Sequence, residues 1–375
     1  MPNNTPQKHG PRSQQKRSIL AQIRRTWARR IRNNKLKSFI ILIVFILIFN
    51  LVDYIRSGSS IRLNDEGYVH AKRFADNAVI NGLDVSEHQG DKINWTKVKS
   101  SGVDFVFVRA GYRSAGKGEL FEDKYYKQNI RGAAKAGLMV GVYFYSQAVT
   151  PNEAVAEANY ILSLVRGLDI DLPIVIDYET YPDGRLEKAI ESGNMYAAYM
   201  YHDIVLSFCR IVQNAGYEPG IYANYDMFTN YMDASLIDDE AVLWIAQYGK
   251  STALKARYSF WQCSESAKSG GIEGNVDHNF WYIKPNKTYK TRAINSYTDR
   301  ISISKCDISF SKDSYNLRKH RADAKVTVQY KNKKLKKGRD YDVFFLNNTD
   351  KGTGYALIRG LNKYTDYTAK PYMIK

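Results

Sequence analysis

Short apolar segments alternate with amphipathic segments through the middle of the chain. The apolar segments have the length of strands, and the segments between the first five have the period of helices. The predicted strands cover residues 79–86, 105–112, 139–146, 172–179, 220–225, 241–248, 258–265 and 274–282. Strands that alternate with helices form parallel sheets, whereas the last three segments leave little room for helices. The pattern predicts an α/β barrel of eight strands and about five helices whose final part is nearly all strand.

A separate apolar run precedes the predicted barrel. Every residue from Phe39 to Phe49 is apolar, and the run continues with few interruptions to Ile55. At about 1.5 Å per residue this run reaches roughly 25 Å, enough for a short transmembrane helix. A cleaved signal peptide is the alternative, but its basic region is short, whereas 38 residues precede this run. We therefore predict an uncleaved transmembrane signal-anchor over residues 38–55.

Charge is distributed unevenly along the chain, whose net charge is +17. Residues 1–37 carry 11 Lys and Arg and no acid, residues 290–375 carry 20 against 8 Asp, and residues 38–289 have a net charge of −6. Because Lys and Arg crowd the N-terminal side of the anchor, that side is predicted to be cytoplasmic and the rest of the chain extracytoplasmic. A main domain without excess positive charge argues against a nucleic-acid partner. Residues 56–78 are predicted to form a polar stalk, and no cofactor or metal is expected.

Carboxylates mark the ends of several predicted strands. In the stretch LPIVIDYETY, Asp177 and Glu179 are two positions apart, so both side chains point to the same face of the fourth strand. Asp84 ends the first strand and Asp277 lies on the eighth. In β/α barrels the carboxyl ends of the strands carry the chemistry. A protonated acid paired with a carboxylate in an aromatic cleft is what cleavage of a glycosidic bond requires. Capping of the next helix is the alternative for a single pair, but it explains acids on three strands less well.

Polar and aromatic residues on the other strands are candidates for substrate binding. They are Arg109, Tyr112, Tyr143, Tyr145, Tyr178, Tyr222, Trp244, Gln247, Trp261 and Gln262. The aromatic residues would stack on sugar faces, and about half of them are expected to be barrel core because aromatic side chains bury large areas.

These motifs resemble those of the glycoside hydrolase family 25 lysozymes, the Chalaropsis-type N-acetylmuramidases. GLDVSEHQG is similar to the family's opening strand, IVIDYE to its Asp-x-Glu strand, LWIAQY to its sixth strand and GNVDHNFWY to its closing Val-Asp-x-Asn. FVFVRAGYRS and the segment from FEDKYY to GVYFYS are similar to its second and third strand units. The resemblance runs from about 79 to 284. It implies an irregular (β/α)5β3 TIM-like barrel, which we assign to residues 79–288.

The resemblance also implies an activity and residue roles. The reaction would be cleavage of the β-1,4 bond between N-acetylmuramic acid and N-acetylglucosamine in peptidoglycan. Glu179 would be the general acid, and Asp177 would stabilise charge at the sugar C1 or orient the substrate's acetamido group. Asp84 and Asp277 would hold these two groups and their ionisation states. One departure is visible, because some members carry Lys-x-[Ser/Thr]-Glu-Gly where this chain has the run from Arg109 to Tyr112, which weakens the inference of a substrate contact there.

Residues 296–375 differ in character from the barrel. They alternate in strand fashion and resemble the short Ig-like repeat of bacterial surface proteins. The residues that match its pattern are Leu335, Gly338, Asp340, Tyr341, Asn347, Asn348, Gly360 and Tyr364. We predict a small all-β Ig-like accessory domain. Its positive charge suits anionic wall polymers, although a solvated basic face is equally ordinary.

Taken together, the sequence predicts a membrane-anchored bacterial muramidase that faces the cell wall and acts in its remodelling. The first alternative is a catalytically weak or inactive peptidoglycan-binding scaffold of the cell envelope. The second is a glycosidase that acts on another N-acetylated glycan.

Overall fold

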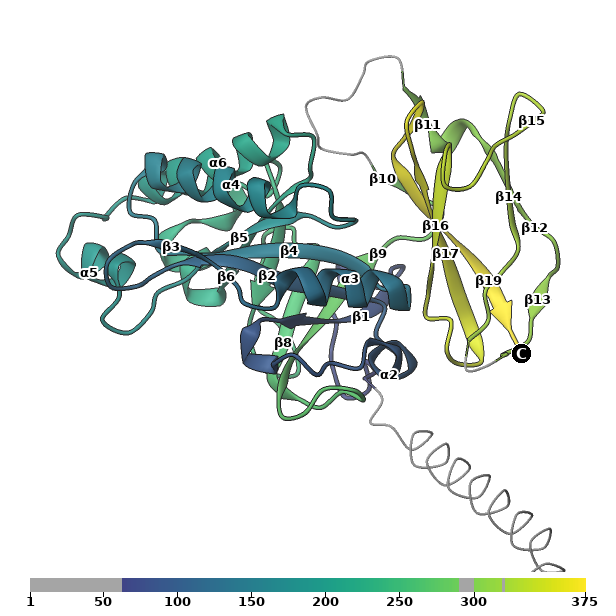
Figure 1. Cartoon of the computed structure of the whole chain (residues 1–375), viewed down its shortest axis with the longest axis horizontal. Coiled ribbons are helices and arrows are strands. Elements are labelled where there is room, and N and C mark those ends of the chain that lie inside the picture. The colour runs from purple at the N-terminus through teal and green to yellow at the C-terminus, as the bar shows by residue number, and fades with distance from the viewer. Residues whose placement is uncertain (1–62, 290–299, 319–320) are drawn as a thin grey trace, which may run out of the picture. The chain divides into compact units, whose positions relative to one another are not determined.

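The computed structural model describes residues 63–289, 300–318 and 321–375 (Figure 1). The predicted basic segment 1–37, the predicted signal-anchor 38–55 and the first part of the predicted stalk lie outside the described residues. Within the described ranges, no helix combines the length and the apolar character that a membrane span needs.

Eight strands of one sheet close into a barrel. They are β1 (Ala78–Val85), β2 (Phe105–Arg113), β4 (Met139–Ser146), β5 (Ile174–Tyr178), β6 (Pro219–Asn224), β7 (Val242–Ala246), β8 (Phe260–Ala267) and β9 (Val276–Ile283). Neighbours from β1 through β8 are parallel, and β9 closes the ring by pairing antiparallel with both β8 and β1. The short β3 (Leu120–Glu122) pairs with the end of β2 as a hairpin. The predicted α/β barrel is confirmed, with strand ends within one or two residues of those expected.

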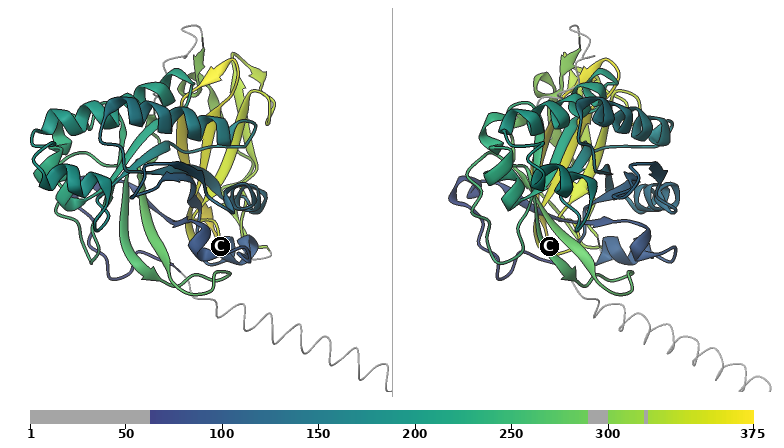
Figure 2. Two further views of the ribbon diagram at one scale, coloured as in Figure 1. Left: turned by 60° about the vertical axis from the view of Figure 1, so that its left-hand side comes forward. Right: turned by 90° about the vertical axis from the view of Figure 1, so that its left-hand side faces the viewer.

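Five helices lie between β1 and β6 along the chain, and they cover the outside of the sheet (Figure 2). They are α2 (Trp95–Ser100), α3 (Tyr126–Ala136), α4 (Pro151–Val165), α5 (Arg185–Glu191) and α6 (Ala198–Asn214). The start of α4 shows why the chain turns helical there: the Thr150 side chain accepts from the Glu153 backbone N–H, and Pro151 fixes the first turn. Its apolar residues recur three or four positions apart and pack on the sheet. From β6 to the end of β9 the described chain forms no further α-helix.

Residues 63–77 cover the outer face of β8 and β9, where helices are missing. The ring of Phe74 stacks on Tyr282 with centroids 3.9 Å apart, and Tyr68 contacts Phe280 edge-on. The Arg73 guanidinium donates to the backbone carbonyls of Leu254 and Lys255 at 2.9 and 2.7 Å. The segment expected to be a polar stalk is therefore part of the folded unit from residue 63 onward.

The lower half of the barrel, away from the carboxyl ends of the parallel strands, is filled by large side chains. Phe105, Phe107, Phe260 and Trp281 lie inside it and are buried. Two strand glycines make the room: a Cβ on Gly82 would lie 2.2 Å from the Phe105 ring, and one on Gly141 would lie 2.3 Å from Phe107. The barrel floor is therefore a packed core with no passage.

The chain ends in an all-β domain. Its strands are β10 (Thr288–Tyr289), β11 (Ile301–Ser302), β12 (Asp307–Phe310), β13 (Ser314–Tyr315), β14 (Val326–Tyr330), β15 (Lys333–Lys334), β16 (Tyr341–Leu346), β17 (Gly352–Gly360), β18 (Tyr364–Thr365) and β19 (Tyr367–Ile374). One sheet has the order β10-β19-β17-β16, with β13 on β19, and a second has the order β12-β14-β15. Side chains from both sheets share one core. The domain is all-β as predicted, and its Ig-like character stays a prediction.

The larger C-terminal sheet is buried on both faces. Along β17, Ala356 and Ile358 face the domain's own core, whereas Leu357 between them joins the apolar cluster of the barrel floor. Polar contacts flank this packing: Arg359 forms an ion pair with Asp171 at 3.1 Å, and the Asn347 backbone N–H donates to Asp104. The barrel floor and the C-terminal sheet therefore form one continuous core.

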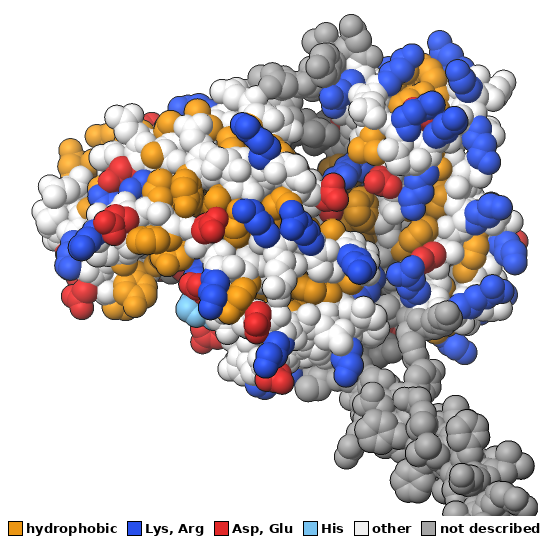
Figure 3. Space-filling view, in the orientation of Figure 1, with side chains coloured by type: hydrophobic (Ala, Val, Ile, Leu, Met, Phe, Trp, Pro, Cys, Tyr) orange, Lys and Arg blue, Asp and Glu red, His pale blue; other side chains and the backbone are white. Residues whose placement is uncertain are grey.

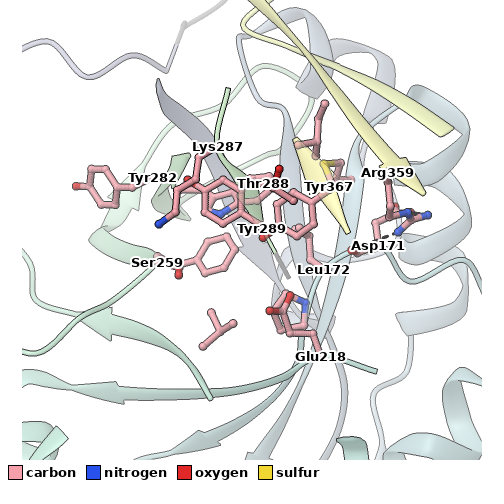
Figure 4. A pocket seen from close by; sticks show the side chains of 16 residues that line it. Asp171, Leu172, Glu218, Ser259, Tyr282, Lys287, Thr288, Tyr289, Arg359 and Tyr367 are labelled. Carbon is pink, nitrogen blue, oxygen red and sulfur yellow. Dashed lines mark hydrogen bonds and ion pairs between the residues drawn. The ribbon is translucent and has the colours of Figure 1, made fainter. Parts of the chain in front are cut away.

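A cavity of about 290 Å³ lies at this junction (Figure 4). Phe260 and Trp281 from the barrel and Tyr289 and Tyr367 from the C-terminal sheet contribute to its lining. It is at the floor, at the opposite end of the strands from the acids of the sequence motif. The cavity is therefore separate from the acids at the other end of the barrel.

Candidate active site

The two carboxylates of the Asp-x-Glu motif emerge at the carboxyl end of β5. Val175 faces the barrel interior, whereas Ile176 and Tyr178 pack in the outer layer beneath the helices. The alternation of a strand therefore directs Asp177, and Glu179 just after the strand, inward. Asp177 is 6% exposed, and its Oδ1 accepts no hydrogen bond from the described residues. A buried carboxylate oxygen without a donor is rare in folded proteins and is suited to receive one from a ligand.

Asp84 and Asp277 form a second acidic pair at the same end of the barrel. They are direct partners in the antiparallel register of β1 and β9. Asp84 is buried, and its Oδ1 accepts from the side-chain amides of Gln262 and Asn279 at 2.9 and 2.7 Å. β9 lies opposite β5 in the eight-strand ring. The pair of Asp84 and Asp277 therefore lies across the barrel mouth from the pair at the end of β5.

Burial and mutual repulsion keep protons on this group of acids. Burial, then the charge of Asp84, raises the pKa of Glu179 to about 7. The same two causes, in the same order, raise the pKa of Asp277 to about 9. Burial and the neighbouring Glu179 hold the pKa of Asp177 well above its ordinary value. The group therefore contains protonated carboxyls at neutral pH, which is the state a general acid needs.

Arg109 brings a fixed positive charge to the group. Its Nε donates to Asp123 at 3.0 Å and its Nη2 to Glu87 at 2.9 Å. Its charge acts against the upward shift in the pKa of Asp177. Because two carboxylates already hold the guanidinium, its main action on the site is electrostatic.

Gln147, at the end of β4, positions the loop that carries Glu179. The side chain is fully buried, and its Nε2 donates to the Glu179 backbone carbonyl at 2.9 Å and to the Tyr145 hydroxyl at 3.2 Å. Its Oε1 accepts from the Leu186 backbone N–H at 3.4 Å. One side chain thus fixes both ends of the segment between β5 and α5.

Comparison with known proteins identifies the barrel. The family model of glycosyl hydrolases family 25 matches residues 83–272, just over half of the chain. The chain belongs to glycosyl hydrolase family 25. The predicted family and the predicted enzyme class, a glycoside hydrolase, are thereby confirmed. Asp84, Asp177 and Glu179 lie within the match, and Asp277 follows it closely.

Two curated relatives are lysozymes. The autolytic lysozyme of Clostridium acetobutylicum is 28% identical over 197 residues, which cover 52% of this chain and 54% of the relative. Lysozyme M1 of Streptomyces globisporus is 28% identical over 222 residues, which cover 55% of this chain and 68% of the relative. The modular autolysin LytC from Streptococcus pneumoniae is similar in structure, with a TM-score of 0.46 and 26% identity over 54% of this chain and 47% of that chain. The match thus spans about half the length of the first relative.

The remaining predicted site residues of this family 25 barrel fall into three groups. Tyr143, Tyr222, Trp244 and Gln262 point into the barrel but are buried beneath the acids. Tyr112 and Tyr145 are half-buried at the mouth, whereas Gln247 lies next to the inward Tyr248 and accepts from the Ala253 backbone N–H at 2.8 Å. Tyr178 and Trp261 point the other way, because each is next in sequence to an inward residue of its strand. Tyr178 donates to the Ala148 carbonyl and Trp261 to the Gln247 carbonyl, so the structure brings neither ring into the mouth.

Several residues of the site were not predicted from the sequence. Asn279 lies two positions after Asp277 in the closing motif, so its inward direction was readable from strand alternation. Its Oδ1 accepts from the Trp244 indole at 2.8 Å while its amide holds Asp84. Gln147 had only the weak signal of a polar residue just after a strand. Nothing in the sequence marks Glu87 and Asp123 as partners of Arg109, because Asp123 reaches it from the far side of the β2–β3 hairpin.

Proposed function

We propose that this chain is a membrane-anchored peptidoglycan hydrolase, an N-acetylmuramidase that cleaves the β-1,4 bond between N-acetylmuramic acid and N-acetylglucosamine. The observation that carries the proposal is the pair at the end of β5, in which Glu179 has a pKa of about 7 and a buried oxygen of Asp177 accepts no hydrogen bond from the described residues. The family and its two lysozyme relatives support the substrate class.

Glu179 performs the acid step in this proposal. Its carboxyl gives a proton to the glycosidic oxygen as the C1–O bond breaks, so the leaving sugar departs with a neutral hydroxyl. A pKa near 7 keeps a fraction of this carboxyl protonated at neutral pH while leaving it acidic enough to give the proton up. A water molecule then adds at C1, and its proton restores the carboxyl.

Asp177 acts on C1, the carbon atom of the bond that breaks. Positive charge develops at C1 as the bond breaks, and a carboxylate nearby stabilises it. The free Oδ1 also suits the N–H of the substrate's acetamido group, whose oxygen would then be directed at C1. Both roles need the ionised form, and the positive charge of Arg109 favours that form against the burial and the Glu179 charge that raise the pKa of Asp177. Asp84 and Asp277, one accepting from the other, hold the remaining charge in place.

The experiment that tests this function is digestion of purified peptidoglycan by the full-length protein. We expect soluble glycan fragments and new reducing ends to appear together. Binding to the peptidoglycan without new reducing ends would instead favour the alternative of an inactive scaffold in the cell envelope.

We also propose the predicted topology, a single-pass bacterial membrane protein with residues 1–37 in the cytoplasm. The apolar run from Phe39 and the basic residues before it support this proposal. Protease added to intact protoplasts is expected to degrade the barrel and spare a small N-terminal fragment. A mature protein that begins near Ser60 would show instead that the run is a cleaved signal peptide.

The proposed partner of the C-terminal domain is an anionic wall polymer. The hairpin of β14 and β15 with its following turn, the basic hairpin, carries the exposed residues Lys331, Lys333, Lys334, Lys336, Lys337 and Arg339. Arg339 is paired with Asp340, and none of the five lysines forms an ion pair with another described residue. Figure 3 shows Lys and Arg side chains over this part of the domain. Such a surface attracts phosphate- or carboxylate-bearing polymers.

A further inference from the structure

Exposed aromatic side chains in the described chain gather at one end of the barrel. They are Phe121, Tyr181, Tyr196, Tyr199 and Tyr248. Each follows the carboxyl end of a strand: Phe121 is in the hairpin after β2, Tyr248 follows β7, and the other three lie between β5 and the first turn of α6. This is the end that carries the acids. Figure 3 shows hydrophobic side chains gathered over the region of β3 and α5. Large aromatic rings held in water indicate a binding surface.

One aromatic platform is built on the β2–β3 hairpin. Tyr112 and Phe121 are cross-strand partners, and their rings stack with centroids 5.4 Å apart and planes 25° apart. The Arg109 guanidinium lies over the Tyr112 ring at 5.1 Å and is itself fixed by Glu87 and Asp123. Phe121 is 41% exposed. The platform is therefore rigid, and it is anchored to the same arginine that acts on Asp177.

A second platform is the ring of Tyr248. The strand alternation of β7 places Tyr248 on the inward side with Trp244, beyond the end of the strand. Its hydroxyl donates to Gln262 Oε1 at 3.2 Å, and the amide of Gln262 donates to Asp84. The ring is nevertheless 51% exposed. Tyr248 is thus held in place by the network of the acids while its ring remains open to solvent.

The order of the strands sets these two platforms on opposite sides of the mouth. In the closed ring of eight, β2 lies opposite β7, and β5 lies opposite β9. The line that joins the two platforms therefore crosses the line from β5 to β9, which joins the two acidic pairs. A polymer that follows the aromatic line passes over the acid pair with rings beneath it on both sides.

We propose that Phe121 with Tyr112, and Tyr248 opposite, are two sugar-stacking platforms that bind a glycan strand on both sides of the bond to be cut. The ligand class is a polymeric β-linked glycan, because the flat, C–H-rich face of a pyranose ring packs on an aromatic face. The strand runs across the mouth from the β2–β3 hairpin to the β7–β8 loop. This inference rests on the proposed function and adds the path that the substrate follows across the barrel mouth.

The test compares Phe121→Ala and Tyr248→Ala with Tyr196→Ala in the full-length protein. Tyr196 is the matched control because it is 78% exposed at the same end but follows β5, off the proposed line. On long peptidoglycan glycan strands we expect each of the first two changes to raise KM about two- to tenfold, the range of one aromatic stacking contact, with kcat little changed. Tyr196→Ala is expected to keep the wild-type KM.

Binding gives a readout that does not need turnover. In a Glu179→Gln background, calorimetric titration with long strands should show the same loss of affinity for Phe121→Ala and Tyr248→Ala. Unchanged KM and affinity in both variants, or an equal loss in Tyr196→Ala, would overturn the proposed path while leaving the muramidase proposal intact. A wild-type protein that cuts no peptidoglycan would contradict the muramidase proposal and this inference with it.

Discussion

Asp84 and Asp277 lie directly opposite each other on the antiparallel strands β1 and β9, and burial together with the charge of Asp84 raises the pKa of Asp277 to about 9. Asp277 therefore carries a proton at neutral pH and gives Asp84 a donor in addition to its two amides. Burial raises the pKa of Asp84 as well, and the hydrogen bonds from Gln262, Asn279 and Asp277 act against that rise. The charge of Asp84 adds to the effect of burial in raising the pKa of Glu179. The pair on one side of the barrel thus contributes to the protonation of the acid on the other side.

The first prediction concerns the general acid. Glu179→Gln is expected to lower the rate of peptidoglycan cleavage by about 10²- to 10⁴-fold, because an amide cannot protonate the leaving oxygen. The circular dichroism spectrum and melting temperature should stay close to wild type, since Gln has nearly the same shape. Glu191→Gln, an exposed change at the end of α5, is the control and should keep full activity. A Glu179→Gln variant with more than about a tenth of the wild-type rate would contradict the assigned role.

The second prediction is a pH dependence. Glu179 has a pKa of about 7 and acts in its protonated form, so kcat/KM should fall as the pH rises through about 7. Asp84→Asn removes the negative charge that raises this pKa, so the alkaline limb should move to lower pH. The measurement is the pH profile of kcat/KM on soluble peptidoglycan fragments for both proteins. A limb that stays in place, or moves to higher pH, would show that Asp84 does not act on Glu179 in this way.

The third prediction concerns the junction with the C-terminal domain. Leu357 is buried in the cluster of the barrel floor, and Leu357→Asp would place a charge there without a partner. We expect a lower melting temperature for the whole described unit, still in a single transition, because the floor and the sheet share one core. Met373→Asp, at an exposed position of β19, is the control and should melt like wild type. Two separate transitions, with the barrel unaffected, would show that the C-terminal domain is an independent accessory.

The fourth prediction concerns the basic hairpin. Replacing Lys333, Lys334 and Lys336 by Glu should weaken sedimentation with purified cell walls at low salt, where charges are least screened. The difference from wild type should shrink as the salt concentration rises, and cleavage of small soluble fragments should be unchanged. Equal sedimentation of both proteins at every salt concentration would mean that the hairpin is only a solvated basic surface.

The sequence allowed the barrel and its acids to be predicted because both follow short-range rules. Alternation along β5 is enough to place Asp177 and Glu179 on one face. The same rule, applied one residue further, would have removed Tyr178 and Trp261 from the substrate-binding set, since each is adjacent to an inward residue. Both rings lie in the outer layer beneath the helices or the covering segment, which nearness to a strand end does not reveal.

Other features depended on contacts that no local pattern encodes. Residues 63–77 have no helical or strand period, yet Tyr68 and Phe74 find rings on β8 and β9 that lack a covering helix. Gln147 acts on a loop more than thirty residues away in sequence. Leu357 is apolar between two apolar neighbours, so its separation onto the barrel face is evident only once the sheet is seen to be buried on both sides.

The central claim of the account is the identity of the bond that this chain cuts. Purified peptidoglycan is digested with the full-length protein, and the soluble fragments are reduced with borohydride and analysed by mass spectrometry. A muramidase breaks the bond at C1 of N-acetylmuramic acid, so we predict fragments that end in reduced N-acetylmuramic acid. Fragments that end in reduced N-acetylglucosamine, or no fragments beyond those from the Glu179→Gln control, would contradict the account.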